Sequence, residues 1–473
     1  MNTPNIINRK PAPLPVRTLA KHLECAEISA ESHVDECLGK AVKSSNVFVS
    51  IDESVRESAR VVDANRQDGK SMSPLAGVPI TLKDLFDVKK QKTLAGSKVL
   101  QHTATLAAQD CDVVRDLREA GLLFLGRTNM SEFAFSGMGL NPHYGNCQSV
   151  WDRNTGRLPG GSSSGSAVSV AEGIVSATMG SDTAGSCRIP AAFNGIVGVK
   201  PSYGRLSLNG VFPLSKTSDV PGPLGVDLDS CFLLDHVMTS PSIKNATRVS
   251  QLPSIAKHEP ADIRLLLPES IVLNDLDSDV ERRFERSVDW MKEAGFSVIR
   301  EKMPVLDRCI DMFSSRAIAL YEAWLLHQEW LQSHGDLYDP FVRQRIMNGS
   351  ALNDQLQQDR YDEKHQIVTD FNQQFSDTSA DVVIYPTVAC VPPPISDTDD
   401  TSRIAEINLR CLRNTSTANC FDGCSISLPC HDVGEAPVGF MVSGPNGMDS
   451  RLYEIAATIE SVLNDARKTG SPS

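Results

Sequence analysis

Apolar residues recur along this chain at two different spacings, and the alternation between the spacings predicts an α/β fold. Residues 17–66 place apolar side chains at helical intervals, as on the buried face of amphipathic helices. Residues 78–82 are a short run of apolar and β-favouring residues, which is typical of a buried strand. A helical pattern near 110–121 and a second buried strand at 122–126 follow. This strand–helix–strand order indicates a largely parallel sheet region covered by helices.

Two loops of small residues interrupt this pattern. Residues 159–166 (PGGSSSGS) have the composition of a flexible linker, but they run directly into a helix of small residues and then into an apolar strand. Residues 181–190 (SDTAGSCRIP) form the second loop. Because a helix followed by a strand returns the chain to near its starting point, we expect the two loops to meet in space.

The second half of the chain adds a helix-rich section. Charged helical patterns follow a predicted strand at 263–268, and one of them closes at Gly295, a residue that favours helix ends. We interpret residues 260–375 as a helical cap inserted into one α/β unit, with strands returning at 381–387 and 437–443 and a last helix at 449–464. The predicted organisation is an irregular leader (1–16), a single domain (17–467) that includes this cap, and a short tail (468–473).

Composition and charge exclude several classes of function. The chain has 473 residues, of which 41% are hydrophobic, and a formal net charge of -13. An acidic balance argues against a broad surface for nucleic acid or anionic membranes, and the longest apolar runs fall short of the roughly 18 residues that a membrane span needs. The N-terminus lacks the apolar core of a secretory signal, and the 12 cysteines are scattered like the free thiols of a reducing compartment. We therefore expect a cytoplasmic protein.

One group of cysteines stands close to a histidine. Cys420, Cys424 and Cys430 precede His431, but they lack the paired short spacings of a zinc site. We interpret them as small buried core residues, and we expect neither a metal nor a cofactor.

The two small-residue loops contain the groups that a nucleophilic hydrolase requires. Such an enzyme needs an activated hydroxyl or thiol, a base, and donors for an oxyanion. The second loop places Thr183, Ala184, Gly185 and Ser186 in succession. Small residues let backbone N–H groups approach a ligand closely, so this run is a candidate oxyanion site.

The base is harder to identify from the residues alone. Neither loop contains a histidine, and the nearest, His143, lies in a predicted surface loop. Residues 161–165 match the G-x-S-x-G pattern around Ser163, but the apolar strand that should precede it is missing. Lys83 ends the apolar strand 78–82, where burial can lower a lysine pKa from its usual value of about 10.4. Serine–lysine catalysis is therefore plausible here but not proved.

Four segments together match a known family. They are PLAGVPITLKD (74–84), GRTNMSEFAF (126–135), GGSSSGS (160–166) and GSDTAGSCRIPAAFNGIVGVKPSYGR (180–205). In this order, and with this spacing between the two serine loops, they resemble the amidase signature family. The resemblance covers most of 20–230 and recurs at 381–445. It implies a large central mixed, mostly parallel β-sheet flanked by helices, with a helical cap insertion.

The resemblance also implies roles for single residues. Lys83 matches the family's base, Ser162 its bridging serine, which follows a cis peptide bond, and Ser186 its nucleophile. The backbone N–H groups of 183–186 would hold the oxyanion. Asp182 and Arg188 match supporting positions that are structural rather than chemical.

Three positions depart from the family pattern or leave a choice. Ala184 stands where the family often has glycine, which predicts a tighter pocket. Cys187 stands where an aliphatic residue is usual; we interpret it as a packing residue, with a nucleophilic thiol as the minor alternative. Ser163 competes with Ser162 for the relay role, and the spacing favours Ser162.

Four residues are candidates for the walls of a substrate pocket: Met130, Phe135, Gly137 and Ile189. For any one of the large apolar residues, core packing is at least as good an interpretation. The apolar Ile189 argues mildly against a substrate that carries a carboxylate.

The resemblance implies a serine hydrolase that cleaves small carboxylic amides through an acyl-enzyme, and also accommodates esters or carbamates. The alternative is the glutamine-amidase subunit of a tRNA-dependent amidotransferase. A weaker alternative is a non-catalytic binding module. We expect a monomer or homodimer that binds neither nucleic acid nor membrane.

Overall fold

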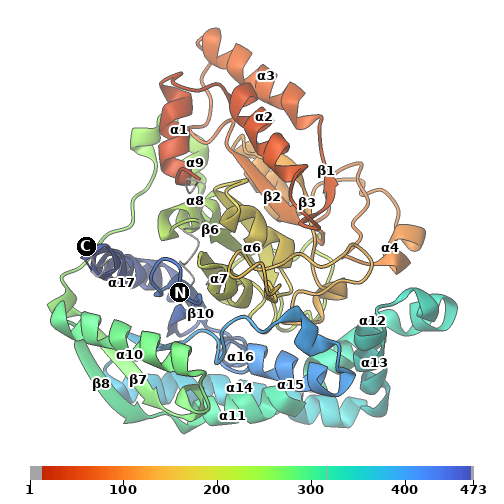
Figure 1. Ribbon diagram of the computed structural model, residues 1–473, viewed down its shortest axis with the longest axis vertical. Helices are drawn as coiled ribbons and strands as arrows, with labels where there is room; N and C mark the ends of the chain where they lie inside the picture. The colour runs from red at the N-terminus through yellow and green to blue at the C-terminus, as the bar shows by residue number, and fades with distance from the viewer. Residues whose placement is uncertain (1–12, 316, 470–473) are drawn as a thin grey trace, which may run out of the picture.

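A single mixed β-sheet organises the molecule (Figure 1). The computed structural model describes residues 13–315 and 317–469. The strands are β1 (Phe48–Ile51), β2 (Pro79–Lys83), β3 (Leu123–Thr128), β4 (Ala177–Asp182), β5 (Val197–Lys200), β6 (Val220–Gly225), β7 (Arg264–Glu269), β8 (Ser297–Lys302), β9 (Val382–Pro386), β10 (Cys424–Pro429) and β11 (Gly439–Gly444). They form an 11-stranded sheet in the order β1-β3-β2-β4-β6-β5-β10-β11-β9-β7-β8.

Parallel pairs are fewer in this sheet than the sequence predicted. The mixed sheet flanked by helices is confirmed, but only four of the ten strand pairings are parallel: β2 with β3, β2 with β4, β7 with β8, and β7 with β9. The expectation of a mostly parallel sheet is therefore wrong. In its middle, β6 (VPGPLG) pairs antiparallel with β4 and β5, and β10 pairs antiparallel with β5 and β11. The glycine and proline residues of β6 give it no β-favouring pattern, and partners this distant in sequence are not revealed by periodicity.

Helices cover both faces of the sheet. In the first part of the chain, up to residue 293, the helices are α1 (Val16–Glu24), α2 (Ala30–Ala41), α3 (Val55–Gln67), α4 (Lys98–Thr103), α5 (Asp112–Glu119), α6 (Ser164–Ala171), α7 (Arg188–Asn194), α8 (Leu228–Thr239), α9 (Pro241–Asn245) and α10 (Ser278–Glu293). Those that follow are α11 (Pro304–Ser315), α12 (Ala317–His334), α13 (Pro340–Asn348), α14 (Asp354–Thr378), α15 (Thr401–Leu412), α16 (Ser416–Cys420) and α17 (Asp449–Thr469). Short 3-10 helices are η1 (Glu132–Ala134), η2 (Val249–Gln251), η3 (Pro260–Asp262), η4 (Ile271–Leu273), η5 (Gly335–Leu337), η6 (Gly349–Ala351) and η7 (Ile395–Thr398).

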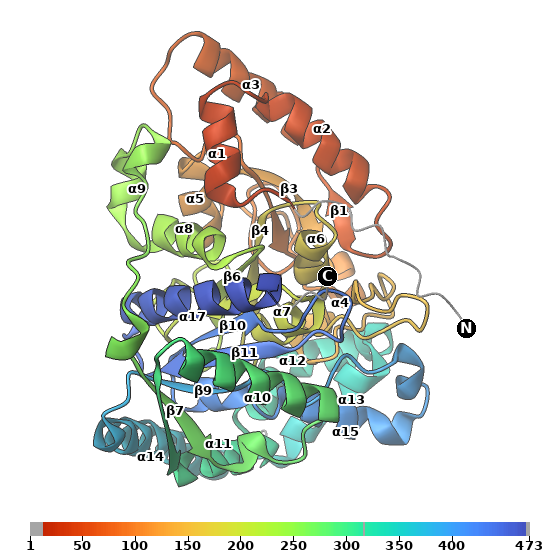
Figure 2. The same cartoon turned by 60° about the vertical axis from the view of Figure 1, so that its left-hand side comes forward.

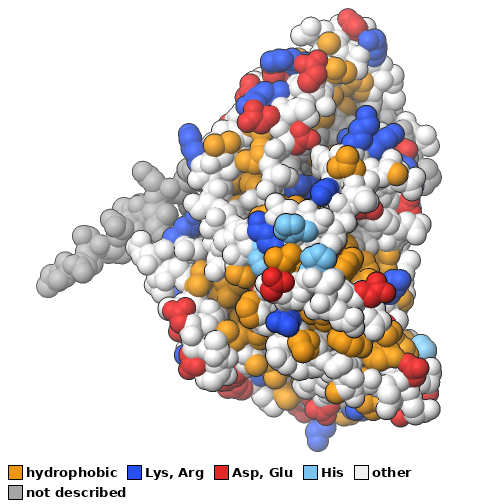
Figure 3. Space-filling model, turned by 90° about the vertical axis from the view of Figure 1, so that its right-hand side faces the viewer, with side chains coloured by type: hydrophobic (Ala, Val, Ile, Leu, Met, Phe, Trp, Pro, Cys, Tyr) orange, Lys and Arg blue, Asp and Glu red, His pale blue; other side chains and the backbone are white. Residues whose placement is uncertain are grey.

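Alternation along β11 shows how each face is covered. Phe440 and Val442 join the buried cluster formed with α10 and α17, whereas Met441 joins the cluster formed with α11, α14 and α16. Successive side chains of a strand point to opposite faces, so these two helix groups lie on opposite sides of the sheet. Figure 2 shows α10 and α17 side by side over the strands, with α11 and α14 beyond them. On the face shown in Figure 3, acidic and basic side chains are interspersed with apolar ones.

Several predicted elements appear within a few residues of their expected bounds. These include the strands β2, β3, β7, β9 and β11 and the helices α5, α6 and α10. Ser29 caps α2 by accepting a hydrogen bond from the Ser32 N–H at 3.0 Å. Helix α10 ends at Glu293. Its C-cap residue is Ala294, and Gly295 follows with φ 103°. The last helix is longer than predicted and runs to Thr469.

Other boundaries differ from the sequence analysis. The predicted loop 181–190 ends early, because α7 begins at Arg188. The predicted cap at 260–375 contains β7 and β8, which belong to the main sheet, so the purely helical segment is 304–378. Of the predicted leader, residues 1–12 lie outside the described residues, and α1 already begins at Val16. Residues 470–473 of the predicted tail also lie outside them.

The cysteine group near His431 lies in the core, as predicted. Cys420, Cys424 and Cys430 are each no more than 5% exposed. Among the described residues, none of the helices is both long and apolar enough to cross a membrane.

Removing one large side chain from the sheet core should cost measurable stability. Phe440 is fully buried, with its ring centroid 5.2 Å from that of Phe284 on α10. We expect Phe440→Ala to lower the free energy of unfolding by about 3–5 kcal/mol, because it leaves a cavity between α10 and the sheet. Urea titration measures this change. Val433→Ala, at a side chain that is 73% exposed, is the control and should stay within about 0.5 kcal/mol of the wild type; equal effects of the two variants would contradict the packing argument.

Candidate active site

A buried lysine lies at the centre of the candidate site. Lys83 is the last residue of β2 and is completely buried. Its Nζ donates to Ser162 Oγ at 2.7 Å and to Ser181 Oγ at 2.8 Å. Burial lowers the pKa of Lys83 to about 8, because the charged form loses its hydration. A lysine in this setting is partly neutral near physiological pH and has a hydroxyl within reach.

The two small-residue loops meet, as the sequence analysis expected. The Ser163 N–H donates to the Ser186 carbonyl oxygen at 3.3 Å, which joins the first loop to the second. The Gly161–Ser162 peptide bond is cis, as the resemblance implies. The Ser163 hydroxyl donates to the Ser181 carbonyl oxygen at 3.3 Å instead of contacting Lys83. Ser162, and not Ser163, is therefore the serine of this loop that contacts the lysine.

Ser181 is a contact that the sequence analysis missed. It lies on β4, which pairs in parallel with β2. The register aligns Leu82 with Met179, so the carboxyl end of β4 runs beside Lys83 and brings the Ser181 hydroxyl to its Nζ. The sequence feature that could have revealed this contact is a pair of predicted parallel strands, β2 and β4, that both end at polar residues.

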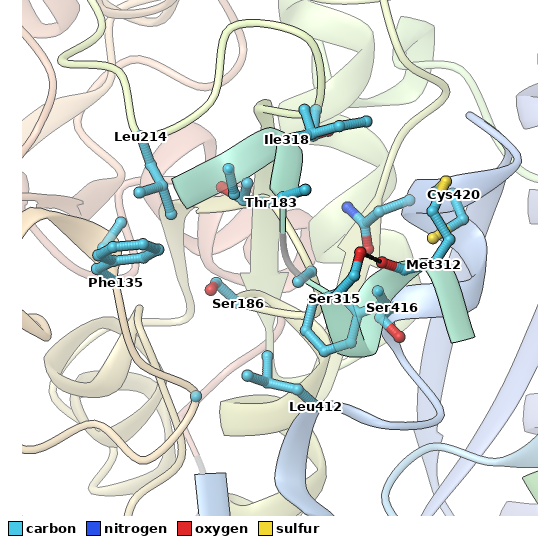
Figure 4. A pocket seen from close by; sticks show the side chains of 18 of the residues that line it. Phe135, Thr183, Ser186, Leu214, Met312, Ser315, Ile318, Leu412, Ser416 and Cys420 are labelled. Atoms are coloured by element: carbon cyan, nitrogen blue, oxygen red, sulfur yellow. Dashed lines mark hydrogen bonds between the residues drawn. The ribbon is translucent and has the colours of Figure 1, made fainter. Parts of the chain in front are cut away.

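Ser186 lies at a pocket, on the second small-residue loop, which is bonded to the first. It follows Gly185 just before α7, is 3% exposed and lines the pocket (Figure 4). Gly185 adopts φ 131°, and a Cβ on it would come within 2.1 Å of Thr415 Oγ1. Only glycine fits at this position, because a side chain would clash with Thr415 and other residues rarely adopt this φ.

A fully buried ion pair holds the Ser186 loop. Asp182 accepts from Arg188 at 2.9 Å and 3.0 Å and from the N–H groups of Gly185 and Cys187 at 2.7 Å and 3.0 Å. Burial alone would raise the pKa of Asp182, but the Arg188 guanidinium outweighs it and lowers the pKa to about 2. Asp182 thus bonds to the backbone of the Ser186 loop, and neither Asp182 nor Arg188 is among the residues that line the pocket.

This ion pair also corrects the predicted oxyanion donors. Of the run 183–186, the Gly185 N–H is directed at Asp182 Oδ1 and is not free to bind a substrate. Within the described residues, the N–H groups of Thr183, Ala184 and Ser186 have no protein acceptor. The Thr183 hydroxyl donates to Asp219 Oδ1 at 2.6 Å, which leaves its N–H unaffected. The candidate oxyanion donors are therefore the N–H groups of Thr183, Ala184 and Ser186.

The pocket comprises about 800 Å³ of empty space, including the part that is open to solvent, and is walled by segments that are distant in the sequence. Figure 4 shows Phe135 and Leu214 on one side of Ser186, and Ser416 and Cys420 on the other. Of the predicted pocket residues, Phe135 and Gly137 line it.

The other two predicted pocket residues do not line this pocket. Met130 and Ile189 are fully buried and pack in two different hydrophobic clusters. The core interpretation, which the sequence analysis had left open, therefore holds for both residues.

The helical segment 304–378 supplies much of the remaining wall. It contributes apolar residues around Met312 and Ile318 and the basic side chains of Arg345, Arg360 and Lys364. None of the lining residues in the described part of the chain is Asp or Glu.

The alternative catalytic groups lie elsewhere. Cys187 is fully buried, burial raises the pKa of its thiol, and the sulfur donates to the Gly222 carbonyl oxygen at 3.5 Å. A thiol in this state is a poor nucleophile. His143 contacts Glu132 at 3.0 Å and does not line the pocket.

Comparisons with known proteins agree with this geometry. A family model described as Amidase matches residues 34–453. A 2-amino-5-chloromuconic acid deaminase of Comamonas testosteroni is 29% identical over 454 residues, which cover 94% of this chain and 96% of that protein. A glutamyl-tRNA(Gln) amidotransferase subunit of Symbiobacterium thermophilum is 30% identical over 472 residues, 94% of each chain. A solved amidase structure is 28% identical with a TM-score of 0.83, covering 96% of this chain and 99% of that one.

The pKa of Lys83 predicts how the reactivity of Ser186 depends on pH. A lysine that accepts a proton must be neutral, and the neutral form prevails above the pKa. We expect the rate at which a fluorophosphonate modifies Ser186 to rise as the pH increases through about 8 and then to level off. Lys83→Met should remove both the rise and most of the rate. A wild-type rate that is constant from about pH 6 to about pH 9 would rule out a titrating lysine.

Proposed function

The chain belongs to the amidase family of amide-hydrolysing enzymes, and we propose that Ser186 is its nucleophile, Ser162 its proton relay and Lys83 its base. The observation that carries the proposal is the 2.7 Å contact between Lys83 Nζ and Ser162 Oγ. This pair is buried behind a loop that presents Ser186 to the pocket. A hydroxyl nucleophile needs an adjacent base, and no histidine lines the pocket among the described residues.

The first chemical step forms an acyl-enzyme. Neutral Lys83 takes the proton of Ser162, Ser162 takes the proton of Ser186, and Ser186 Oγ attacks the amide carbonyl carbon. Negative charge then develops on the carbonyl oxygen. The N–H groups of Thr183, Ala184 and Ser186 are the proposed donors to it, because donors fixed before the reaction stabilise such charge most effectively.

The second half of the reaction returns the site to its starting state. The relay returns the proton to the leaving nitrogen as the C–N bond breaks, and ammonia or an amine departs. Water then attacks the acyl carbon and gives up a proton through the same relay to Lys83. The relay returns this proton to Ser186 Oγ as the ester C–O bond breaks, and the carboxylic acid departs. Lys83 ends neutral, so the cycle needs no cofactor.

The lining of the pocket favours a small substrate with an apolar or anionic acyl group. Its walls are mainly apolar and carry three basic side chains but no acidic ones. Lys364 and Arg360 are paired with Asp422 and Glu363, which do not line the pocket, so a cationic acyl group would find no carboxylate in the lining to pair with. The mild argument from Ile189 against a carboxylate lapses, because that residue does not line the pocket. The name of the Comamonas testosteroni relative also specifies an acid as its substrate. We propose an amide, with esters or carbamates as further substrates.

The proposed setting is a cytoplasmic monomer or homodimer that acts without nucleic acid or membrane. All twelve cysteines are free thiols, which supports a reducing compartment. A second candidate function is the glutamine-amidase subunit of a tRNA-dependent amidotransferase, which the name of the Symbiobacterium thermophilum relative favours.

The nucleophile is tested by covalent labelling. We expect a fluorophosphonate to label the wild-type chain at Ser186, and Ser186→Ala to lose the label and about 10³-fold or more in kcat. Ser162→Ala should fall similarly, because the relay is broken. Ser163→Ala is the matched control, since its hydroxyl does not contact Lys83, and should retain most of the activity. Persistent labelling of Ser186→Ala would disprove the assignment, and an unlabelled wild type would support a non-catalytic binding module.

The type of substrate is tested by a panel given to the purified chain alone. We expect hydrolysis of small aryl and alkyl amides, faster for neutral and carboxylate-bearing acyl groups than for matched cationic ones. The basic wall of the pocket is the reason for this order. Ammonia or amine release measures each rate, with Ser186→Ala as the blank. Glutamine as the sole substrate, or activity only after a partner chain is added, would favour the amidotransferase role instead.

A further inference from the structure

Glu322, in the helical segment 304–378, accepts several hydrogen bonds from a loop on the pocket wall. Glu322 on α12 accepts from Ser215 Oγ at 2.7 Å, from Thr217 Oγ1 at 2.9 Å and from the Thr217 N–H at 3.4 Å. It also accepts from the Tyr361 hydroxyl of α14 at 2.7 Å. One half-buried carboxylate therefore ties two cap helices to a loop that has no regular secondary structure.

That loop, residues 214–219, is called here the wall loop, because its residues Leu214 and Ser218 line the pocket. Asp219 ends the loop and accepts from the N–H groups of Leu214 and Ser215 at 2.9 Å and 3.0 Å. Asp219 also accepts from Thr183 Oγ1 at 2.6 Å. The wall loop is thus closed on itself and bonded to the loop that presents Ser186.

A second tie comes from α14. Lys364 donates to the Thr217 carbonyl oxygen at 2.7 Å and pairs with Asp422 at 2.7 Å. Thr217 is therefore held through its hydroxyl, its N–H and its carbonyl oxygen, all by the cap. Such a fixed loop transmits the position of the cap to the residues at its ends.

We propose that Glu322 is a positioning residue for hydrolysis, which acts through the wall loop and Asp219 on Thr183 beside the nucleophile. The inference rests on the proposed function of Ser186. Thr183 begins the run that includes Ala184 and Ser186, and the N–H groups of these three residues are the proposed oxyanion donors. Oxyanion stabilisation depends on the donor positions, and a displacement of about 1 Å can cost roughly a hundredfold in rate.

The closing experiment compares Glu322→Ala with the matched control Glu329→Ala. Glu329 lies on the exposed side of the same helix α12. We expect Glu322→Ala to lower kcat/KM by roughly ten- to a hundredfold. Most of the loss should fall on kcat, because the donors act in the transition state. Glu322→Gln should recover part of the loss, since its amide oxygen still accepts two of the bonds, and Glu329→Ala should behave as wild type.

The route through Thr183 is tested by a double-mutant cycle. Thr183→Val removes the hydroxyl that contacts Asp219. If Glu322 acts through this contact, the double variant Glu322→Ala with Thr183→Val should lie within about threefold of the slower single variant. Losses that multiply would overturn the route. A Glu322→Ala variant with a lower thermal midpoint but wild-type kcat, assayed well below that midpoint, would show a purely structural role and overturn the proposal.

Two controls keep these results interpretable. If Glu322→Ala does not fold, Thr217→Val removes one of the same bonds in a milder way, and a wild-type kcat in that variant would count against the proposal. Labelling of the wild type at Ser186 tests the proposed function separately, because every comparison here is relative to the wild-type rate. Failure of the Glu322 inference thus leaves a labelled and active wild type, whereas failure of the proposed function does not.

Discussion

The ion pair of Asp182 and Arg188 is the interaction on which the candidate site depends. Both side chains are completely removed from water, which costs several kcal/mol for each charge unless every donor and acceptor is used. Here the donors and acceptors are used: Arg188 also reaches Asn419 Oδ1 at 2.7 Å and the Thr415 carbonyl oxygen at 2.8 Å. The pair therefore binds the Ser186 loop to α7 and α16 at once, and the position of Ser186 depends on this electrostatic interaction as well as on the loop itself.

Burial has the opposite effect on the charge of Lys83, because it favours the neutral form of this side chain. Asp182 is buried with a counter-charge and remains ionised, whereas Lys83 is buried with two hydroxyls, Ser162 and Ser181, as its nearest hydrogen-bond partners. A hydroxyl offers a hydrogen bond but no compensating charge, so the charged form of the lysine is disfavoured. At the carboxyl ends of the adjacent strands β2 and β4, Asp182 is therefore held charged, whereas Lys83 is brought close to neutrality. A proton relay through serines needs that second condition.

The sequence pattern predicted the parts of the site that depend on residues close together in the chain. The apolar run before Lys83 identified both its strand and its burial, and the loop motifs identified Ser162 and Ser186. The contacts with Ser181 and the diversion of the Gly185 N–H to Asp182 were missed, because they depend on strand order and loop conformation. The antiparallel middle of the sheet was missed for a related reason: a strand such as β6 (VPGPLG) has no β-favouring pattern and is defined by its neighbours. The helical segment was recognised, but its first two strands were assigned to the cap because sheet partners distant in sequence leave no periodic signal.

Chemistry and selectivity come from different parts of the chain, and this separation shapes how the enzyme can vary. The proposed reacting groups all lie between Lys83 and Ser186, on the sheet and its loops, whereas much of the pocket wall comes from the helical segment 304–378. A wall built from another segment can change without disturbing the lysine–serine contacts. Helices that are not bonded to the site can also shift relative to it. The hydrogen bonds between the cap and the wall loop, and the bond from Thr183 to Asp219, hold the helical part of the wall in place relative to the proposed reacting groups.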